Sequence, residues 1–379
     1  MVKTLFVFGT RPEAIKLCPL IQHLKAKPER YAVQVAVTAQ HRQMLDQVLT
    51  AFRVAPDFDF DLMTPNQTLT ALSSRMLAAL EPVLARVKPD IVYVQGDTTS
   101  TLCGALAAFY ARIPVGHVEA GLRTGDVEQP FPEEMNRVVT GRLAAIHFAA
   151  TDGARQNLLR EGVATGRIYV TGNSGIDAVL QVRDRLAAGE LPGGDWSFLN
   201  PEKRLVVVTA HRRESFGPAF ENICAALRRI AGRGDVDVVY PVHRNPNVTG
   251  PVQRHLAGVP GMHLIDPLDY VPFVDLMRRA TLLLTDSGGI QEEGPSLGKP
   301  VIVMREKTER PEAVDAGTVR LAGTDDDTIV AEVSRLLDDD DARAAMSRVH
   351  NPYGDGRASE RIEAATWGFL GRRVNCQSA

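Results

Sequence analysis

The chain has 379 residues, 44% hydrophobic and 23% charged, and 43 Lys and Arg residues nearly balance 46 Asp and Glu residues for a formal net charge of −3. This length predicts two domains, and the composition is typical of a folded globular protein rather than a disordered one. The near-neutral balance provides no bulk attraction for nucleic acid or an anionic membrane, so we expect neither as a partner.

The start of the chain and its cysteines predict a cytoplasmic location. Residues 3–8 run directly into a Gly-Thr-Arg-Pro turn, as a first core strand would, without the pattern of a secretory leader. The four cysteines are far apart and form no C-x-x-C pair, which argues against a zinc site or a disulfide framework. The most apolar stretch, residues 102–118, is interrupted by Arg112 and Pro114, so we expect no membrane span.

Short apolar runs alternate with segments of helical spacing along the first half of the chain. The predicted strands are 4–8, 32–38, 90–94, 115–118, 146–149 and 168–170. The predicted helices between them include 13–25, 69–86 and 99–111. Strands that are apolar on both faces and separated by helices indicate βαβ units with a buried parallel sheet.

The pattern weakens over residues 186–203, where Gly, Pro and Asn cluster, and then begins again. The second set of predicted strands is 204–208, 237–240, 263–265, 282–285 and 301–304. The sequence therefore predicts an α/β protein with two Rossmann-like, doubly wound domains facing a central cleft. We place the domains at 1–172 and 173–354, although a helix at 174–186 fits either side of the boundary.

Two acidic runs, at 325–327 and 338–341, resemble metal-binding clusters at first sight. The first lies where a helix at 329–337 should begin, and the second lies between that helix and another at 343–346. Acidic side chains stabilise the positive end of a helix. We therefore interpret both runs as helix caps and solvated turns, and we expect no metal.

Ionisable residues follow the predicted strands at one edge of the first sheet. Arg11 and Lys16 come after the first strand, Asp97 follows the strand at 90–94, and Glu119 follows the strand at 115–118. Glu133 lies in the next loop. Asp97 also fits a helix cap, and Glu133 also fits the acidic first turn of a helix that begins at Pro132. Glu119, which is flanked by Ala120 and Gly121 after a buried strand, has no obvious capping role.

The second domain carries features of an anion site. Ser287, Gly288 and Gly289 open a helix directly after a strand and present backbone N–H groups, as a phosphate site requires. The neighbouring strand ends supply further basic residues at the same edge: His211, Arg212, Arg213 and His243. Glu292 or Glu293, one turn into the helix, fits a ribose diol. The sequence contains no Walker loop and no strand-linked G-x-G-x-x-G, so it supports neither ATP hydrolysis nor a dinucleotide fingerprint.

Several blocks of these residues occur in an order that resembles one family. The blocks are Gly9-Thr10-Arg11-Pro12-Glu13-Ala14-Ile15-Lys16, Gln95-Gly96-Asp97-Thr98, His117 to Gly125, Thr285 to Glu293, and Glu309-Arg310-Pro311-Glu312-Ala313. Together they resemble the bacterial non-hydrolysing UDP-N-acetylglucosamine (UDP-GlcNAc) 2-epimerases, from Phe6 to about Ile362.

This resemblance implies a fold of the glycosyltransferase-B type, in which a C-terminal helix within 355–379 crosses back to the first domain. It also implies a homodimer that needs no cofactor, neither a nicotinamide nor a metal. The implied substrates are UDP-GlcNAc and UDP-N-acetylmannosamine (UDP-ManNAc), which serve cell-envelope polysaccharides. The implied reaction eliminates UDP to give 2-acetamidoglucal and then adds UDP again after C2 has been reprotonated.

The resemblance also transfers roles onto individual residues. The implied catalytic residues are Asp97, Glu119, Glu133 and His211. The implied substrate-binding residues are Arg11, Lys16, Asp97, Glu119, His211, Phe273, Ser287, Gly288, Gly289, Glu293 and Arg310. A second UDP-GlcNAc site, which activates some relatives, corresponds to Gln40, Gln43, Arg212 and His243. Leu268 stands where some relatives have Gln beside the uracil pocket, so that contact would have to run through the backbone.

Other functions fit the same scaffold and remain open at this point. They are a hydrolysing 2-epimerase that releases ManNAc, a 2-epimerase of a UDP-diacetamido uronic acid, a UDP-sugar glycosyltransferase, and a non-catalytic UDP-sugar sensor. The carboxylate cluster favours an epimerase, because inversion at C2 needs acid–base groups on both faces of the sugar.

Overall fold

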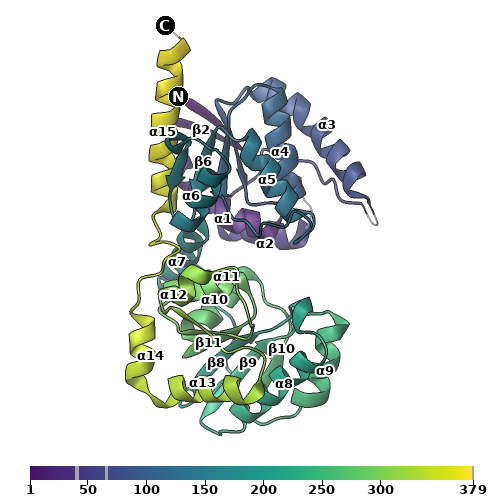
Figure 1. Cartoon of the computed structure of the whole chain (residues 1–379), viewed down its shortest axis with the longest axis vertical. Helices are drawn as coiled ribbons and strands as arrows, with labels where there is room; N and C mark the ends of the chain where they lie inside the picture. The colour runs from purple at the N-terminus through teal and green to yellow at the C-terminus, as the bar shows by residue number, and fades with distance from the viewer. Residues whose placement is uncertain (39–41, 65–66, 378–379) are drawn as a thin grey trace. The chain divides into compact units, whose positions relative to one another are not determined.

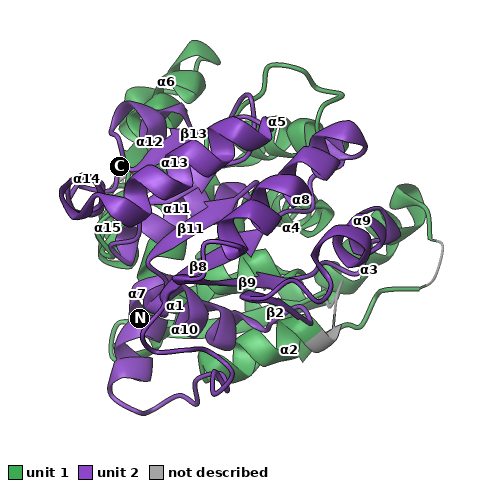
Figure 2. Ribbon diagram, turned by 90° about the horizontal axis from the view of Figure 1, so that it is seen from below, with its two compact units in different colours: residues 1–178, 353–379 green, residues 179–352 purple. Residues whose placement is uncertain are grey.

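The computed structural model describes residues 1–38, 42–64 and 67–377, and among these the side chains of residues 42–43 and 373–377 are not described. The chain divides into two compact units (Figure 1, Figure 2). Unit 1 comprises Met1–Ala178 together with Tyr353–Ala379, and unit 2 comprises Val179–Pro352.

Unit 1 alternates strands and helices from its first residues. Its strands are β1 (Val2–Phe8), β2 (Tyr31–Val37), β3 (Phe58–Asp59), β4 (Ile91–Gln95), β5 (Val115–Ala120), β6 (Ile146–Ala149) and β7 (Ile168–Val170). Its helices are α1 (Arg11–Lys25), α2 (Arg42–Ala51), α3 (Leu69–Val87), α4 (Thr99–Tyr110), α5 (Glu133–Leu143), α6 (Asp152–Arg160) and α15 (Ala358–Gln377), with a 3-10 turn at Thr165–Arg167. Helix α7 (Ser174–Ala187) begins in unit 1 and continues into unit 2.

The described strands of unit 1 form one parallel sheet in the order β3-β2-β1-β4-β5-β6-β7. Every residue of β4 is buried, as expected for a strand covered by helices on both faces. The strand order reverses at β1, which lies between β2 and β4. In open parallel sheets, ligands bind beyond the carboxyl ends of the strands at such a switch point. The loops after β1 and β4 therefore mark the position where a ligand is expected in this unit.

Helix α15 returns the end of the chain to unit 1 and runs alongside its sheet (Figure 1). The buried Tyr93 hydroxyl of β4 donates a hydrogen bond to Thr366 Oγ1 over 2.7 Å. Glu363 pairs with His23 of α1 and with Lys27, which follows that helix. Asp177 accepts hydrogen bonds from the first backbone N–H groups of α15, at Ala358 and Ser359. These contacts make the C-terminal helix part of the core of unit 1.

Unit 2 repeats the same architecture. Its strands are β8 (Arg204–Thr209), β9 (Val236–Pro241), β10 (Met262–Ile265), β11 (Leu282–Thr285), β12 (Val301–Val303) and β13 (Val319–Leu321). Its helices are α8 (Pro218–Ala231), α9 (Pro246–Leu256), α10 (Tyr270–Arg279), α11 (Gly288–Ser296), α12 (Pro311–Asp315), α13 (Asp326–Asp338) and α14 (Asp340–Ser347), with a 3-10 turn at Arg213–Ser215.

The parallel sheet of unit 2 has the order β10-β9-β8-β11-β12-β13. Its switch point lies between β8 and β11, whose following loops carry His211 and Ser287. The core beneath it consists of buried, mostly aliphatic side chains from the strands, α8, α9 and α13, together with Phe220 and Tyr240. The predicted doubly wound α/β fold is thus confirmed in both units.

The structure also corrects several details of the sequence prediction. The two-residue β3 and the three-residue β13 are outer strands that the sequence analysis missed, because such short segments show no periodicity. The C-terminal helix begins at Ala358 and extends to Gln377. The cap interpretation of the acidic runs is confirmed, since Asp325 caps α13 and Asp339 caps α14. Among the described helices, none has the length and apolar character needed to cross a bilayer.

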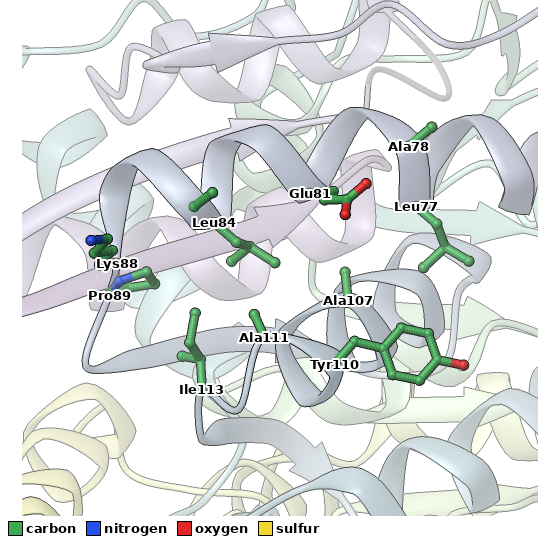
Figure 3. Close-up of a pocket in the computed structure, with 11 residues that line it drawn as sticks. Leu77, Ala78, Glu81, Leu84, Lys88, Pro89, Ala107, Tyr110, Ala111 and Ile113 are labelled. Carbon is green, nitrogen blue, oxygen red and sulfur yellow. The ribbon is translucent and has the colours of Figure 1, made fainter.

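An apolar groove of about 650 Å³ lies between α3 and α4 of unit 1 (Figure 3). Leu77, Leu84 and Tyr110 line it, together with Lys88 and Ile113, which lie shortly before β4 and β5. The groove therefore reaches the amino ends of these strands, opposite the sheet edge where the ionisable residues gather.

Candidate active site

Glu119 has an unusual backbone conformation at the end of β5. Its φ angle is 59°, in the left-handed region that residues other than glycine rarely adopt. The pairing of β5 with β6 shifts register at this point, between Val118 and Ala120. Such a bulge re-aims a side chain at the edge of a sheet. A non-glycine residue in this conformation costs about 1–3 kcal/mol, which the surrounding contacts must offset.

Three side chains from different elements contact the Glu119 carboxylate. Lys16 of α1 pairs with Oε1, and Asn173, in the loop before α7, donates to the same oxygen over 3.2 Å. Gln95, the last residue of β4, donates to Oε2. This set of donors fixes the orientation of the carboxylate. Lys16 and Glu119 are thus brought together as the sequence predicted, whereas Asn173 and Gln95 were not foreseen.

Asp97 lies next to Glu119 in the turn between β4 and α4. It does not cap α4, because Thr98 takes that role, so the capping interpretation of Asp97 is wrong. Its carboxylate contacts the buried Arg137 of α5, with Oδ2 2.7 Å from the guanidinium. Burial raises the pKa of Asp97. The nearby carboxylates of Glu119 and Glu133 raise this pKa further, while Arg137 and Lys16 lower it. We name the group Lys16, Asp97, Glu119 and Glu133 the acid cluster.

Two buried side chains support the backbone around the acid cluster. Glu13 accepts hydrogen bonds from the N–H groups of Gly9 and Thr10 and from the hydroxyl of Thr98. It thereby ties the loop after β1 to the loop after β4, and burial raises its pKa. His117 donates from Nε2 to the carbonyl of Gly96 over 2.7 Å, and burial lowers its pKa to about 4. Both are structural side chains next to the cluster.

The remaining predicted residues of unit 1 lie on the first turns of two helices. Arg11 is the first residue of α1, and Glu133 is the first residue of α5, directly after Pro132. Both are half-buried. Glu133 therefore occupies the acidic first turn that the sequence predicted, and it also contributes to the electrostatic environment of Asp97.

Asp286 organises the loop ends of unit 2. It is fully buried after β11, and its Oδ2 accepts hydrogen bonds from the N–H groups of His211 and Arg212 over 2.6 and 2.7 Å. Thr209 and Thr285 join the ends of β8 and β11 through their hydroxyls over 2.6 Å. The backbone that presents His211 is therefore fixed from the neighbouring strand.

The His211 ring stacks on the ring of His243, with centroids 5.2 Å apart and planes inclined by 11°. Burial lowers the pKa of His211. The neighbouring His243 and Arg212 lower this pKa further, while Asp286 raises it. The imidazole is consequently less readily protonated than an ordinary histidine. An anion placed beside it would reverse this balance by favouring the charged ring.

The start of α11 supplies backbone donors next to His211. Ser287 precedes the helix and, in the described part of the chain, its hydroxyl makes no capping hydrogen bond. The N–H groups of the first turn therefore point outward at the positive end of the helix. Arg310 lies directly over Gly288, where an added Cβ would be 2.7 Å from the guanidinium carbon. Only glycine permits this approach. We name His211, Ser287, Gly288, Gly289 and Arg310 the anion site.

Glu292 and Glu293 are separated by the structure. Glu292 is buried and accepts a hydrogen bond from Arg310 Nε over 2.8 Å, which positions the guanidinium. Glu293 is half-buried and thus more accessible than Glu292, so it is the better candidate for a ribose. Phe273 and Leu268 lie half-buried on α10 and in the segment before it.

The residues of the predicted second ligand site are only partly described. Arg212 and His243 flank His211 at the switch point of unit 2. Gln40 and the side chain of Gln43 lie outside the described residues. In the portion of the chain that is described, no group of three His, Cys, Asp or Glu side chains has the arrangement of a metal site.

The structure adds residues that the sequence analysis did not assign: Gln95, Arg137, Asn173 and Asp286. Gln95 and Asp286 each end or follow a predicted strand, so their positions carried a signal. Arg137 and Asn173 contact acids that are 40 or more residues away along the chain, and no local pattern shows such contacts.

Two parallel-sheet units with polar loops at their switch points define the glycosyltransferase-B class of fold. A glycosyltransferase from Streptomyces nogalater shares this architecture with a TM-score of 0.60 over 97% of this chain and 99% of its own, at 16% identity. The model of the UDP-N-acetylglucosamine 2-epimerase family matches residues 22–366, so the chain belongs to this family.

Individual relatives agree with this assignment. A UDP-N-acetylglucosamine 2-epimerase of Escherichia coli (strain K12) is 59% identical over 366 residues, which cover 95% of this chain and 97% of the relative. The crystal structure of a Neisseria meningitidis UDP-GlcNAc 2-epimerase bound to UDP-GlcNAc superposes with a TM-score of 0.88 at 44% identity. That match covers 97% of this chain and all of the other.

Proposed function

We propose that this protein interconverts UDP-GlcNAc and UDP-ManNAc by a non-hydrolysing reaction at C2, without a nicotinamide or a metal. Its family and its 59% identical relative support this activity. The observation that carries the proposal is the acid cluster, in which Asp97 and Glu119 lie together at the switch point of unit 1. A binding protein or a simple transferase has no evident need for several acids held in this way.

The first step separates the sugar from UDP. The C1–O bond breaks with its electron pair passing to UDP, a carboxylate takes the proton from C2, and a C1–C2 double bond forms to give 2-acetamidoglucal. The leaving diphosphate gains negative charge as the bond breaks. We assign its stabilisation to the anion site, with Arg11 as a further cation, because preorganised donors act most strongly where charge develops.

The second step returns a proton to the opposite face of C2, and UDP adds again at C1. Because the two steps act on opposite faces, they need acid–base groups on both sides of the sugar. We assign this work to Asp97, Glu119 and Glu133 as a group. Lys16 and Asn173 hold Glu119 in place, and exclusion of water protects the glucal from hydrolysis.

Proton NMR of the purified protein with UDP-GlcNAc in D₂O, without added cofactor, tests the proposal. We expect a UDP-ManNAc anomeric signal with deuterium at C2. Free ManNAc with UDP would instead indicate a hydrolysing enzyme. Binding without exchange at C2 would contradict epimerisation of this substrate, and a UDP-diacetamido uronic acid and sugar acceptors would be tried next.

We further propose three features on which the proposed activity does not depend. The protein forms a homodimer, which light scattering would test.

A second UDP-GlcNAc molecule binds near Arg212 and His243 and activates the enzyme. The rate should therefore depend sigmoidally on the UDP-GlcNAc concentration in wild-type protein and hyperbolically in His243→Ala. The enzyme works in the cytoplasm for cell-envelope polysaccharide synthesis. The buried thiols of Cys18, Cys103 and Cys224, which are not disulfide-bonded, fit a reducing compartment.

A further inference from the structure

Arg137 lies buried on α5 between two carboxylates. Its guanidinium is 2.7 Å from Asp97 Oδ2 on one side and 3.3 Å from Glu134 Oε2 on the other. Only 6% of Arg137 and 2% of Glu134 are exposed to solvent. A buried arginine between two acids has little freedom to rotate, so its position relative to Asp97 is set by the surrounding structure.

Glu134 is held by contacts of its own. Its Oε1 accepts hydrogen bonds from the backbone N–H groups of Thr124 and Gly125, over 3.0 and 3.2 Å, in the loop that follows β5. Asn136, on the same helix, donates to the backbone carbonyl of Asp97 over 2.9 Å. One end of α5 thus fixes both the backbone of Asp97 and the cation that meets its side chain.

The charges that face Asp97 come from two further elements, β5 and α1, as well as from α5. Glu119 of β5 and Glu133 of α5 oppose its ionisation, as does burial, while Lys16 of α1 favours it. Lys16 is itself paired with Glu119. Arg137 is the cation in direct contact with the Asp97 carboxylate. Without it, two acids and a low-dielectric environment would favour the protonated form of Asp97.

We propose that Arg137, anchored by Glu134, is a positioning residue that keeps the Asp97 carboxylate ionised and oriented for proton transfer. The inference rests on the proposed function in so far as Asp97 transfers a proton at C2. Arg137 contacts Asp97 rather than the reacting atoms, so it acts through that carboxylate. Glu133, four residues earlier on the same helix, shares this face of α5, which places an acid and the positioning cation in one rigid element.

The test compares Arg137→Gln with wild-type protein over a range of pH. We expect the acidic limb of kcat for UDP-GlcNAc to move upward by about 1–3 pH units, the range that an adjacent opposite charge produces. KM should stay unchanged, because the anion site is intact. Arg137→Lys keeps the charge and should return the limb towards its wild-type position. Arg142→Gln, an exposed arginine on the same helix, is the matched control and should behave as wild type.

A second measurement does not depend on activity. Carbon-13 NMR of labelled aspartate, with Asp97 assigned from Asp97→Asn, should show the pKa of this carboxyl rising in Arg137→Gln. If the single variant fails to fold because Glu134 is left buried without its partner, Glu134→Gln with Arg137→Gln removes both charges and should show the same rise. If wild-type protein leaves UDP-GlcNAc unchanged, the proposed function fails, and the NMR titration still decides the role of Arg137.

Two results would overturn the inference. In the first, Arg137→Gln retains the wild-type pH profile and the wild-type pKa of Asp97. In the second, its kcat falls equally at every pH, which would indicate a purely structural contribution.

Discussion

The acid cluster and the anion site occupy the same topological position in two similar sheets, yet they are built differently. The acid cluster consists of side chains, among which Lys16 pairs with Glu119 and Arg137 of α5 pairs with Asp97, and Glu119 adopts a left-handed backbone conformation to join it. The anion site consists largely of backbone N–H groups, with His211 and Arg310 placed around them. Proton transfer requires groups whose pKa can be tuned, whereas a diphosphate requires fixed positive ends of dipoles. The difference follows from the two kinds of chemistry.

The largest expected effect is that of Asp97→Asn, which distinguishes the contribution of the acid cluster to turnover from that of the anion site to UDP binding. It should lower kcat by about 10²–10⁴, the usual contribution of a general acid or base. The affinity for UDP should stay at its wild-type value, because the anion site is untouched. Calorimetry with UDP and the NMR assay measure both quantities. The control is Asp90→Asn, which changes an exposed aspartate directly before β4. Near-normal turnover of Asp97→Asn would remove Asp97 from the mechanism.

His211→Ala changes the anion site and leaves the acid cluster intact. Hydrogen bonds to charged groups contribute about 1.5–3 kcal/mol, so the affinity for UDP should fall by about 10- to 100-fold. Calorimetry measures the change directly. His255→Ala removes a half-buried histidine of unit 2 that pairs with Glu221, and it should leave UDP binding unaltered. An unchanged affinity in His211→Ala would refute the assignment of His211 to the diphosphate.

Gly288→Ala tests the close approach of Arg310 to the start of α11, because it adds only one methyl group at that position. The added methyl would lie 2.7 Å from the Arg310 guanidinium carbon and would displace that side chain. Arg310 would then no longer lie over the first turn of α11, and because a hydrogen bond to a charged group contributes about 1.5–3 kcal/mol, we expect UDP binding to weaken by about tenfold or more. Gly250→Ala in α9, where the nearest heavy atom is 3.5 Å from the added Cβ, is the matched control. Equal affinities in the two variants would show that Arg310 need not lie over Gly288.

The smallest expected effect is a pH dependence of UDP affinity. Burial lowers the pKa of His211 in the unliganded protein, and a bound diphosphate raises it, so binding takes up a proton. UDP should therefore bind more tightly as pH falls from 8 towards 6, by less than tenfold per pH unit for one proton. The terminal phosphate of UDP also titrates near pH 6, so the contribution of His211 is the difference between wild type and His211→Gln. Parallel slopes in calorimetric titrations would contradict the prediction.

Much of this protein is readable from its sequence. The apolar runs determine where most strands lie, and the carboxyl ends of parallel strands share one edge, so Asp97, Glu119, His211 and Ser287 could be placed at two sheet edges without coordinates. The five motif blocks, such as Gly9 to Lys16 and Thr285 to Glu293, indicated the family. The role of the glycines in the anion site could also be predicted, because glycine permits a ligand to approach the backbone closely at the start of a helix.

Only the tertiary structure showed how the acid cluster is held. Nothing local in the sequence indicates that Glu119 leaves the β conformation, that Asn173 reaches its carboxylate, or that Arg137 meets Asp97. These contacts depend on the register of neighbouring strands and on the rotation of α5 and α1 about their axes. Both are set by the packing of the whole sheet and its helices, so residues far apart along the chain acquire their roles only when the core is assembled.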